Sequence, residues 1–172
     1  KTLYESIYHQ TGVCCVRYPR GGEGNLPAGF APDEAWSVRS ISPKSPRKKL
    51  GLVTYGKETV QVCKAAEQLK EQGIAVSVLK LLRLLPFPED SLRPLMGCDA
   101  ILFVEEGIQS GGIGQMFGEK LLERQYRGEY RILAVDNRFV EQASTDRALA
   151  LTGLDAAGIV RTCQTWLGIA AD

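Results

Sequence analysis

The sequence has little of the material from which metal and redox sites are built. Its one histidine, His9, has no metal-ligand spacing to any cysteine, and no two cysteines form a CxxC pair. The five cysteines are Cys14, Cys15, Cys63, Cys98 and Cys163. The sequence therefore predicts no metal site, and its cysteine pattern favours a reducing compartment, for which we expect the cytoplasm.

An excess of charge of one sign is also missing, as are long apolar runs. The formal net charge is +1, which argues against a nucleic-acid surface, because such surfaces concentrate basic residues. The one basic cluster, from Lys44 to Lys49, lies among serine and proline and is typical of a solvated linker. No apolar run reaches membrane-spanning length, and no signal-peptide pattern opens the chain. We therefore expect no nucleic-acid partner and no membrane partner.

What is present is an ordinary globular composition, 44% hydrophobic and 24% charged, which is enough for one substantial core. From residue 49 on, apolar strand patterns alternate with amphipathic helical patterns. Predicted strands cover residues 50–55, 74–79, 100–104 and 130–135, and predicted helices cover 58–71, 89–95, 115–126 and 155–167. The alternation predicts an α/β domain over residues 49–172, with a mostly parallel sheet and helices on both faces.

The first 48 residues follow a different pattern. Residues 1–22 indicate the end of a helix and then a strand from Val13 to Tyr18, which cannot bury a core without other elements. Residues 23–48 contain four prolines and no clear periodicity, which is typical of a linker, with a short strand expected from Trp36 to Ile41. Because the chain begins with Lys1 inside a helical pattern, we expect a fragment of a longer protein.

The stretch DAILFVEEGIQSGGIGQMF, residues 99–117, joins an apolar strand to a glycine-rich turn and a helix. This arrangement is a common place for ligands in α/β proteins. Glu105 and Glu106 follow the strand as neighbours, and neighbours on a strand point to opposite faces, so they do not form a facing acid–base pair. We expect these two carboxylates, with Gly111, Gly112 and Gly114, to lie at a domain or subunit interface.

Nucleotide binding is a second hypothesis for this stretch. Gly112, Gly114 and Gly118 follow a strand and open a helix, and Asp136 ends the next strand, as in dinucleotide-binding folds. The third glycine comes one residue late, however, and the two upstream carboxylates would repel a pyrophosphate. A freestanding nucleotide-binding regulatory module stays open as an alternative function.

The segment RYPRGG, residues 17–22, carries the most pointed chemistry in the chain. Two arginines, followed by two glycines that permit close approach, can offer forked hydrogen-bond donors to a phosphate. Surface arginines in a turn are the alternative interpretation, and composition alone favours it.

Four segments resemble those of the 1-deoxy-D-xylulose-5-phosphate synthases, a family of the transketolase superfamily. They are CVRYPRGG, LVTYGKETVQVCKAAEQLKEQGIAV, FVEEGIQSGGIGQ and GLDAAGIVRTCQTWL, in the family's order and over nearly the whole chain. The glycine-loop match is shared with transketolases and with the E1 β subunits of 2-oxo acid dehydrogenases, whereas RYPRG and GLDAAGI favour the synthases.

The resemblance implies a C-terminal fragment of an enzyme that uses thiamine diphosphate and magnesium to condense pyruvate with glyceraldehyde 3-phosphate, for isoprenoid precursors. Residues 1–22 would be the tail of the pyrimidine-binding central domain, 23–48 a linker, and 49–172 a three-layer transketolase-like C-terminal domain. Since the chain has no GDG-type motif, we expect the fragment to bind no cofactor, to hold no catalytic residue and to be inactive alone. It would support domain packing and dimerisation, with the missing N-terminal and central domains as partners in a homodimer.

The resemblance also implies one substrate contact. The second arginine of RYPRG, Arg20 here, would bind the phosphate of the aldehyde, with Arg17 and Tyr18 in supporting roles. The chain departs from the family's pattern at Leu82, where an arginine is usual, and at Gly107, where an asparagine is usual. These departures leave a transketolase-like or E1 β-like relative with another substrate as an alternative.

Overall fold

The computed structural model describes residues 8, 11–18, 27–31 and 34–169. Its centre is a five-stranded sheet in the order β1-β3-β2-β4-β5, in which only β1 runs antiparallel to its neighbour. In chain order the elements are β1 (Trp36–Ile41), β2 (Lys48–Tyr55), η1 (Gly56–Glu58), α2 (Thr59–Glu71), β3 (Ile74–Leu81), η2 (Glu89–Leu95), β4 (Ala100–Ile108), α3 (Ile113–Glu123), β5 (Glu129–Val135), α4 (Thr145–Thr152) and α5 (Ala156–Leu167). The predicted α/β architecture is confirmed.

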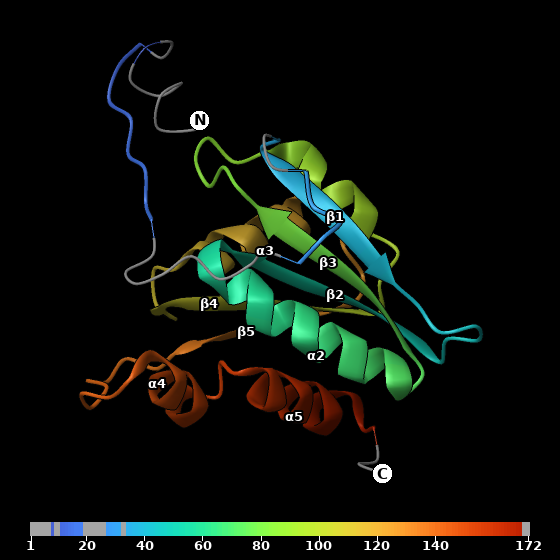
Figure 1. The fold of residues 1–172 in the computed structure, drawn as a ribbon. Helices are drawn as coiled ribbons and strands as arrows, with labels where there is room; N and C mark the ends of the chain where they lie inside the picture. The colour runs from blue at the N-terminus through green and yellow to red at the C-terminus, as the bar shows by residue number, and fades with distance from the viewer. Residues whose placement is uncertain (1–7, 9–10, 19–26, 32–33, 170–172) are drawn as a thin grey trace.

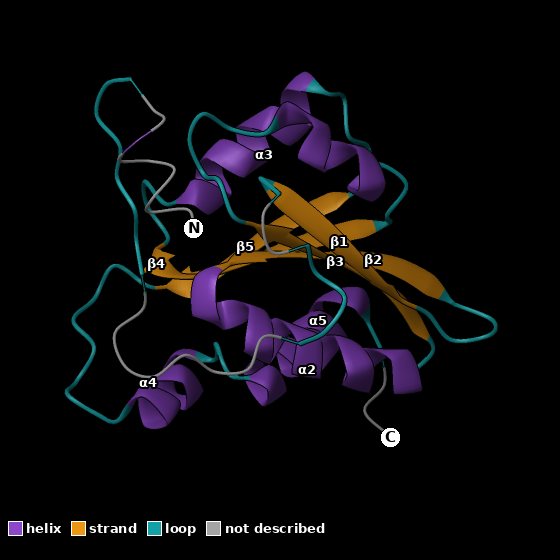
Figure 2. Ribbon diagram, turned by 45° about the horizontal axis from the view of Figure 1, so that its top comes forward, coloured by secondary structure: helices purple, strands orange, loops and turns teal. Residues whose placement is uncertain are grey.

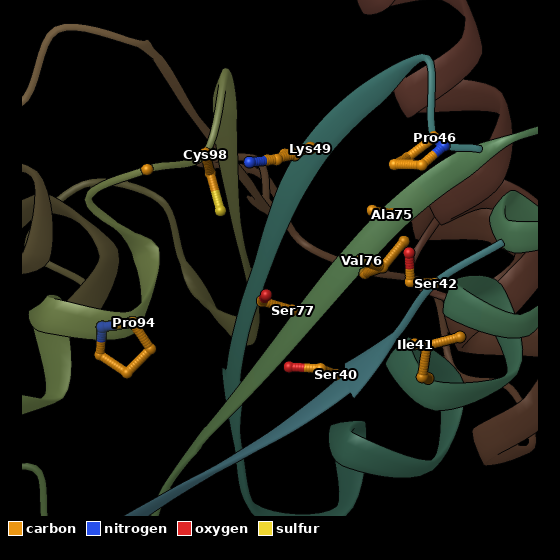
Figure 3. A pocket seen from close by; sticks show the side chains of 11 residues that line it. Ser40, Ile41, Ser42, Pro46, Lys49, Ala75, Val76, Ser77, Pro94 and Cys98 are labelled. Atoms are coloured by element: carbon orange, nitrogen blue, oxygen red, sulfur yellow. The ribbon is translucent and has the colours of Figure 1, made fainter. Parts of the chain in front are cut away.

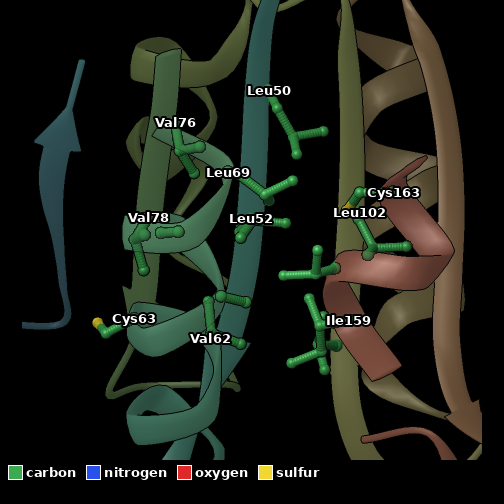
Figure 4. Packing of buried hydrophobic residues seen from close by; sticks show 14 of the residues in the cluster. Leu50, Leu52, Val62, Cys63, Leu69, Val76, Val78, Leu102, Ile159 and Cys163 are labelled. Carbon is green, nitrogen blue, oxygen red and sulfur yellow. The ribbon is translucent and has the colours of Figure 1, made fainter. Parts of the chain in front are cut away.

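Helices cover both faces of the sheet, which gives three layers (Figures 1 and 2). On one face, α2 and α5 pack on the buried strand residues Leu50, Leu52 and Leu102 (Figure 4). Buried side chains of α2 recur at helical spacing, so one stripe of this helix faces the sheet. Strands β2 and β4 are buried on both faces, as their continuous apolar runs predict.

The other face of the sheet is covered by η2 and α3. Here Phe103 of β4 packs on Phe117 of α3, with the ring centroids 5.2 Å apart. Phe87 meets Phe117 edge-on at 5.8 Å, and Tyr130 of β5 stacks on it at 6.1 Å. This aromatic cluster holds α3 against the sheet and so fixes where the glycine-rich turn before it lies.

The expected strand from Trp36 to Ile41 is confirmed, as β1 at one edge of the sheet. An ion pair of 2.7 Å between Arg39 of β1 and Glu67 of α2 ties this edge to the helix beneath it. The expected strand from Val13 to Tyr18 is wrong, because the described residues 11–18 form no strand and both end residues are exposed. A strand needs a partner for its backbone groups, and none of the five strands of the sheet pairs with this segment.

Helix α4 was not expected from the sequence. Its start is capped by Ser144, whose side chain accepts a hydrogen bond from the backbone N–H of Arg147, and it ends at Gly153 in the left-handed conformation. Leu149 is its one buried residue, which leaves little hydrophobic periodicity to detect. Among the described residues, no helix is both long enough and apolar enough to cross a membrane.

Candidate functional site

The carboxyl ends of β2 and β4 form the place where ligands bind in many α/β proteins. The chain leaves β2 towards β3 on one side and returns to β4 on the other, so the topology switches between these two neighbouring strands. Crevices at such switch points, outside the carboxyl ends of the strands, are the general ligand site of open parallel sheets. Glu105 and Glu106 lie near the carboxyl end of β4, which extends beyond the predicted end at residue 104, and Gly111, Gly112 and Gly114 follow the strand at this edge.

Glu105 lies at the centre of this edge with its side chain turned inward, and it is 1% exposed. Its carboxylate accepts hydrogen bonds from the hydroxyl of Tyr55 at 2.9 Å, the backbone N–H of Ile113 at 3.2 Å and the backbone N–H of Gly114 at 3.0 Å. The two amides are the first donors of α3, and a negative charge at a helix N-terminus is favourable. One carboxylate therefore joins β2, β4 and α3.

The glycines of the turn leave room for this carboxylate. A Cβ atom added at Gly112 would lie 2.4 Å from Oε1 of Glu105, and one added at Gly114 would lie 3.0 Å from the same atom. Gly111 has a φ of +77°, in the left-handed region that favours glycine. Gly118 serves a different contact, since a Cβ there would lie 2.7 Å from the ring of Tyr130. The glycine pattern thus follows from packing within the chain.

The nucleotide-binding alternative gains no support from this geometry. The helix amides that would hold a pyrophosphate donate to Glu105, and the N–H of Gly111 donates to the side chain of Gln115 at 2.7 Å. Asp136, the candidate for a ribose contact, lies 3.6 Å from the guanidinium of Arg138. The turn looks like a phosphate cradle, but a carboxylate of the chain itself occupies it.

Tyr55 is held as a neutral donor. Burial raises the pKa of its phenol above the usual range, and the negative charge of Glu105 raises the pKa further because a phenolate beside a carboxylate is unfavourable. The positive charge of Arg17 acts in the opposite direction on the same phenol. Arg17, one of the predicted supporting residues, therefore exerts its charge at this edge.

The other residues of the predicted phosphate-binding segment are placed less fully. Arg17 and Tyr18 are both exposed. Arg20 lies outside the described residues. The contact between Arg20 and the phosphate of the substrate therefore stays a prediction.

A pair of carboxyl groups at this edge, Glu58 and Glu106, was not predicted from the sequence. Glu106 points to the opposite face from Glu105 and is exposed, and across from it at the start of α2 lies Glu58, which is 2% exposed. Burial raises the pKa of Glu58 to about 8, and the charge of Glu106 and a hydrogen bond that the protonated acid can donate to it add to the rise. The residues are far apart in sequence, so only the fold reveals the pair.

The described residues do not fit the magnesium and diphosphate of a thiamine cofactor. They contain no group of three or more His, Cys, Asp or Glu side chains that could hold a metal ion. The helix N-terminus at the switch point, the natural place for a diphosphate, faces Glu105 instead.

A pocket of about 290 Å³ lies at the opposite, amino edge of the sheet (Figure 3). Its polar lining consists of serine hydroxyls, the thiol of Cys98 and Lys49. Burial raises the pKa of Cys98 to about 11, so this thiol is protonated at neutral pH and is a poor nucleophile. The pocket therefore contains no reactive thiol.

Comparisons with known proteins give the chain its relatives. A family model described as transketolase, C-terminal domain, matches residues 40–159. A 1-deoxy-D-xylulose-5-phosphate synthase from a Synechococcus strain is 31% identical over 163 residues, which cover 92% of this chain and 25% of that protein. The synthase of Alkalilimnicola ehrlichii is 30% identical over 166 residues, which cover 96% of this chain and 26% of that protein. The chain thus spans about a quarter of the length of these relatives.

Solved structures give the same result for the fold. A split gene transketolase, described as an "inactive beta4 tetramer", superposes with a TM-score of 0.69 and 26% identity, over 85% of this chain and 48% of that one. The transketolase of Campylobacter jejuni has a TM-score of 0.57 at 15% identity, over 82% of this chain and 20% of that one, and it supports the fold alone. The resemblance inferred from the sequence motifs is confirmed.

The role of Glu105 can be tested by Glu105→Gln. An amide keeps one acceptor but sets an NH₂ group against backbone donors, so we expect the free energy of unfolding to fall by about 2 kcal/mol. Urea denaturation at neutral pH measures the change. The matched control is Glu119→Gln on the exposed side of α3, which should change the stability by less than about 0.5 kcal/mol. Equal effects of the two variants would contradict the assigned role.

The raised pKa of Glu58 predicts a pH dependence of stability. The folded state holds this proton up to about pH 8, whereas the unfolded state releases it near the ordinary value of 4.5, so Glu58 lowers stability as pH rises through that window. Glu58→Gln removes the titrating carboxyl group and with it this pH dependence of the free energy of unfolding. Urea denaturation at about pH 6 and about pH 9 should therefore show the variant gaining on the wild type by on the order of a few kcal/mol at the higher pH. A constant difference at both pH values would refute the raised pKa.

Proposed function

The chain belongs to the transketolase C-terminal domain family, and from this membership we propose that it is the C-terminal part of a thiamine-diphosphate-dependent 1-deoxy-D-xylulose-5-phosphate synthase. The full enzyme would condense pyruvate with glyceraldehyde 3-phosphate. The observation that carries the proposal is the match to curated synthases, which runs over 96% of this chain and so includes positions 17–20. The RYPRG segment thus lies inside the aligned region.

Arg20 is the residue proposed to touch substrate. The phosphate of the aldehyde is a dianion, and a guanidinium offers it a permanent charge and a planar fork of donors. Arg17 and Tyr18 would support Arg20 from the same segment. All three come from the N-terminal side of the chain, not from the glycine-rich turn.

The work of the remaining chain is proposed to be structural. The cofactor and the magnesium ion would be held by N-terminal and central domains that lie beyond the quarter of the relatives matched here. Residues 1–22 would end the central domain, 23–48 would link the two, and 49–172 would form the C-terminal domain. The chain by itself would be inactive, and the full enzyme would be a cytoplasmic homodimer.

The proposed interface lies at the switch-point edge. Glu106 and Gly111 are exposed there and would contact the neighbouring domain or subunit. The interface would depend indirectly on Glu105, Gly112 and Gly114, because their contacts with one another maintain the shape of the turn. In this proposal the buried carboxylate shapes the surface that the exposed residues present.

A transketolase-like or E1 β-like relative with another substrate is the second candidate, and the structural comparison favours the transketolase. The split gene transketolase covers 85% of this chain at 26% identity, and the departures at Leu82 and Gly107 weaken the synthase motifs. The two candidates differ in the donor substrate, since a synthase decarboxylates pyruvate and a transketolase takes a ketose phosphate. An assay of the full-length protein with each donor distinguishes them.

The substrate contact is tested by Arg20→Ala in the full-length enzyme. Loss of a charge-assisted contact should raise the KM for glyceraldehyde 3-phosphate by about 10-fold to 100-fold while the KM for pyruvate changes little. The control is Arg161→Ala on the exposed side of α5, which should leave both values unchanged. Steady-state kinetics with each substrate varied in turn supplies the numbers. An unchanged KM for the aldehyde would refute the role of Arg20.

A further inference from the structure

Strand β5 forms an open edge of the sheet. It pairs with β4 on one side, and on its other side no strand of the described residues pairs with it (Figure 1). The difference between the two neighbours is visible in their burial, since the first five residues of β4 are all buried whereas β5 buries only Ala134. An unpaired strand edge presents a row of N–H and C=O groups to which another strand can bond.

The backbone pattern of β5 shows which of these groups are free. The N–H of Glu129 donates to the carbonyl of Asp99, so residue 129 bonds towards β4. The N–H and C=O of one strand residue point to the same side, and successive residues alternate between the two sides. Tyr130 and Ile132 therefore direct their N–H and C=O groups away from the sheet, towards the open edge.

The charged side chains of β5 complement a second copy of the same strand. Glu129 and Arg131 lie two residues apart and are both exposed, so they share one face of the strand. Trp166 of α5 positions both, because its indole N–H donates to Glu129 at 2.6 Å and its ring lies 5.0 Å from the guanidinium of Arg131. Within the described residues neither charged side chain forms an ion pair. Both charges are therefore open to an ion pair with a partner.

We propose that β5 pairs antiparallel with β5 of a second copy of this chain, about a two-fold axis at Tyr130. In this register Glu129 of each copy lies opposite Arg131 of the other, so one axis creates two attractive charge pairs. The outward groups of Tyr130 exchange hydrogen bonds across the axis, and the adjacent charge pairs then take the closer, non-hydrogen-bonded positions. An axis at residue 129 or 131 would instead set like charges opposite each other.

The face of β5 opposite to these charges carries an apolar groove. The groove has a volume of about 500 Å³, and its lining includes Leu122 of α3 with Tyr130 and Ile132 of β5. Leu122 is 77% exposed, although it is a large apolar side chain. A two-fold axis at Tyr130, perpendicular to the sheet, brings the α3 helices of the two copies side by side over this face. The pairing of the strands thus also covers the groove and Leu122.

Only the place of this contact in a full-length enzyme rests on the proposed function. The pairing uses residues of this chain alone, and it lies at a different edge of the sheet from the proposed interface at Glu106 and Gly111. The 172-residue chain is therefore sufficient for the test.

The test measures self-association of the chain by sedimentation velocity. Glu129→Arg and Arg131→Glu each set two like-charge pairs across the axis, so each variant alone should dimerise at least about 10-fold more weakly than the wild type. A mixture of the two variants has opposite charges at both pairs and should regain dimerisation. The controls are Glu71→Arg and Lys64→Glu, charge reversals at exposed positions of α2, which should leave the association unchanged.

Three results would overturn the proposal. The first is a wild-type chain that stays monomeric up to about 1 mM, a concentration at which even weak specific dimers form. The second is a Glu129→Arg or Arg131→Glu variant that dimerises as tightly as the wild type. The third is a mixture of the two variants that associates no better than either variant alone.

Hydrogen exchange tests the strand pairing in the wild-type chain itself, so it does not depend on how the variants fold. The amides of Tyr130 and Ile132 should exchange more slowly at a concentration that favours the dimer than in dilute solution. The amides of Arg131 and Leu133 already bond towards β4 and should change far less. Exchange of Tyr130 and Ile132 at the same rate in both samples would overturn the pairing. Since no enzyme assay is used, the outcome is independent of whether the full-length protein is a synthase.

Discussion

The structure of this edge depends on one interaction, in which the buried carboxylate of Glu105 in β4 accepts hydrogen bonds from the first amides of α3. A charge taken out of water is costly unless donors replace the lost hydration. Here one hydroxyl and two helix amides do so, and they come from β2 and α3 while the carboxylate belongs to β4. The glycines at 112 and 114 follow directly, because a Cβ atom at 112 would collide with the carboxylate and one at 114 would crowd it.

The same interaction determines what the edge can do. A switch point with a glycine turn and a free helix N-terminus would bind a phosphate, but this helix N-terminus is neutralised from within. What remains for an outside partner is the exposed surface of the turn at Gly111 and the exposed side chain of Glu106. An accessory domain that packs against a catalytic neighbour fits these properties better than a freestanding ligand-binding module.

Much of the fold could be predicted from local pattern. Continuous apolar runs predicted β2 and β4, and apolar residues at helical spacing predicted α2 and α5. These elements are predictable because the residues that each one buries form a pattern within its own segment. The strand expected from Val13 to Tyr18 failed because pairing depends on a partner that this sheet does not supply. Helix α4 was missed because it buries only Leu149.

The site was harder to predict than the fold. The sequence located the glycine turn correctly, yet no local pattern shows that Glu105 turns inward and fills it. The pairing of Glu58 with Glu106 depends on the juxtaposition of η1 and β4, which periodicity within either segment cannot reveal.

The most direct test of this account is an NMR titration that follows the backbone amides of Ile113 and Gly114. With thiamine diphosphate or ATP as the probe, we expect no saturable shift of either amide, because both donate to Glu105. In Glu105→Gln both amide signals should move without any probe. Saturable shifts of the two amides in the wild-type chain on addition of a phosphate compound would contradict the central claim.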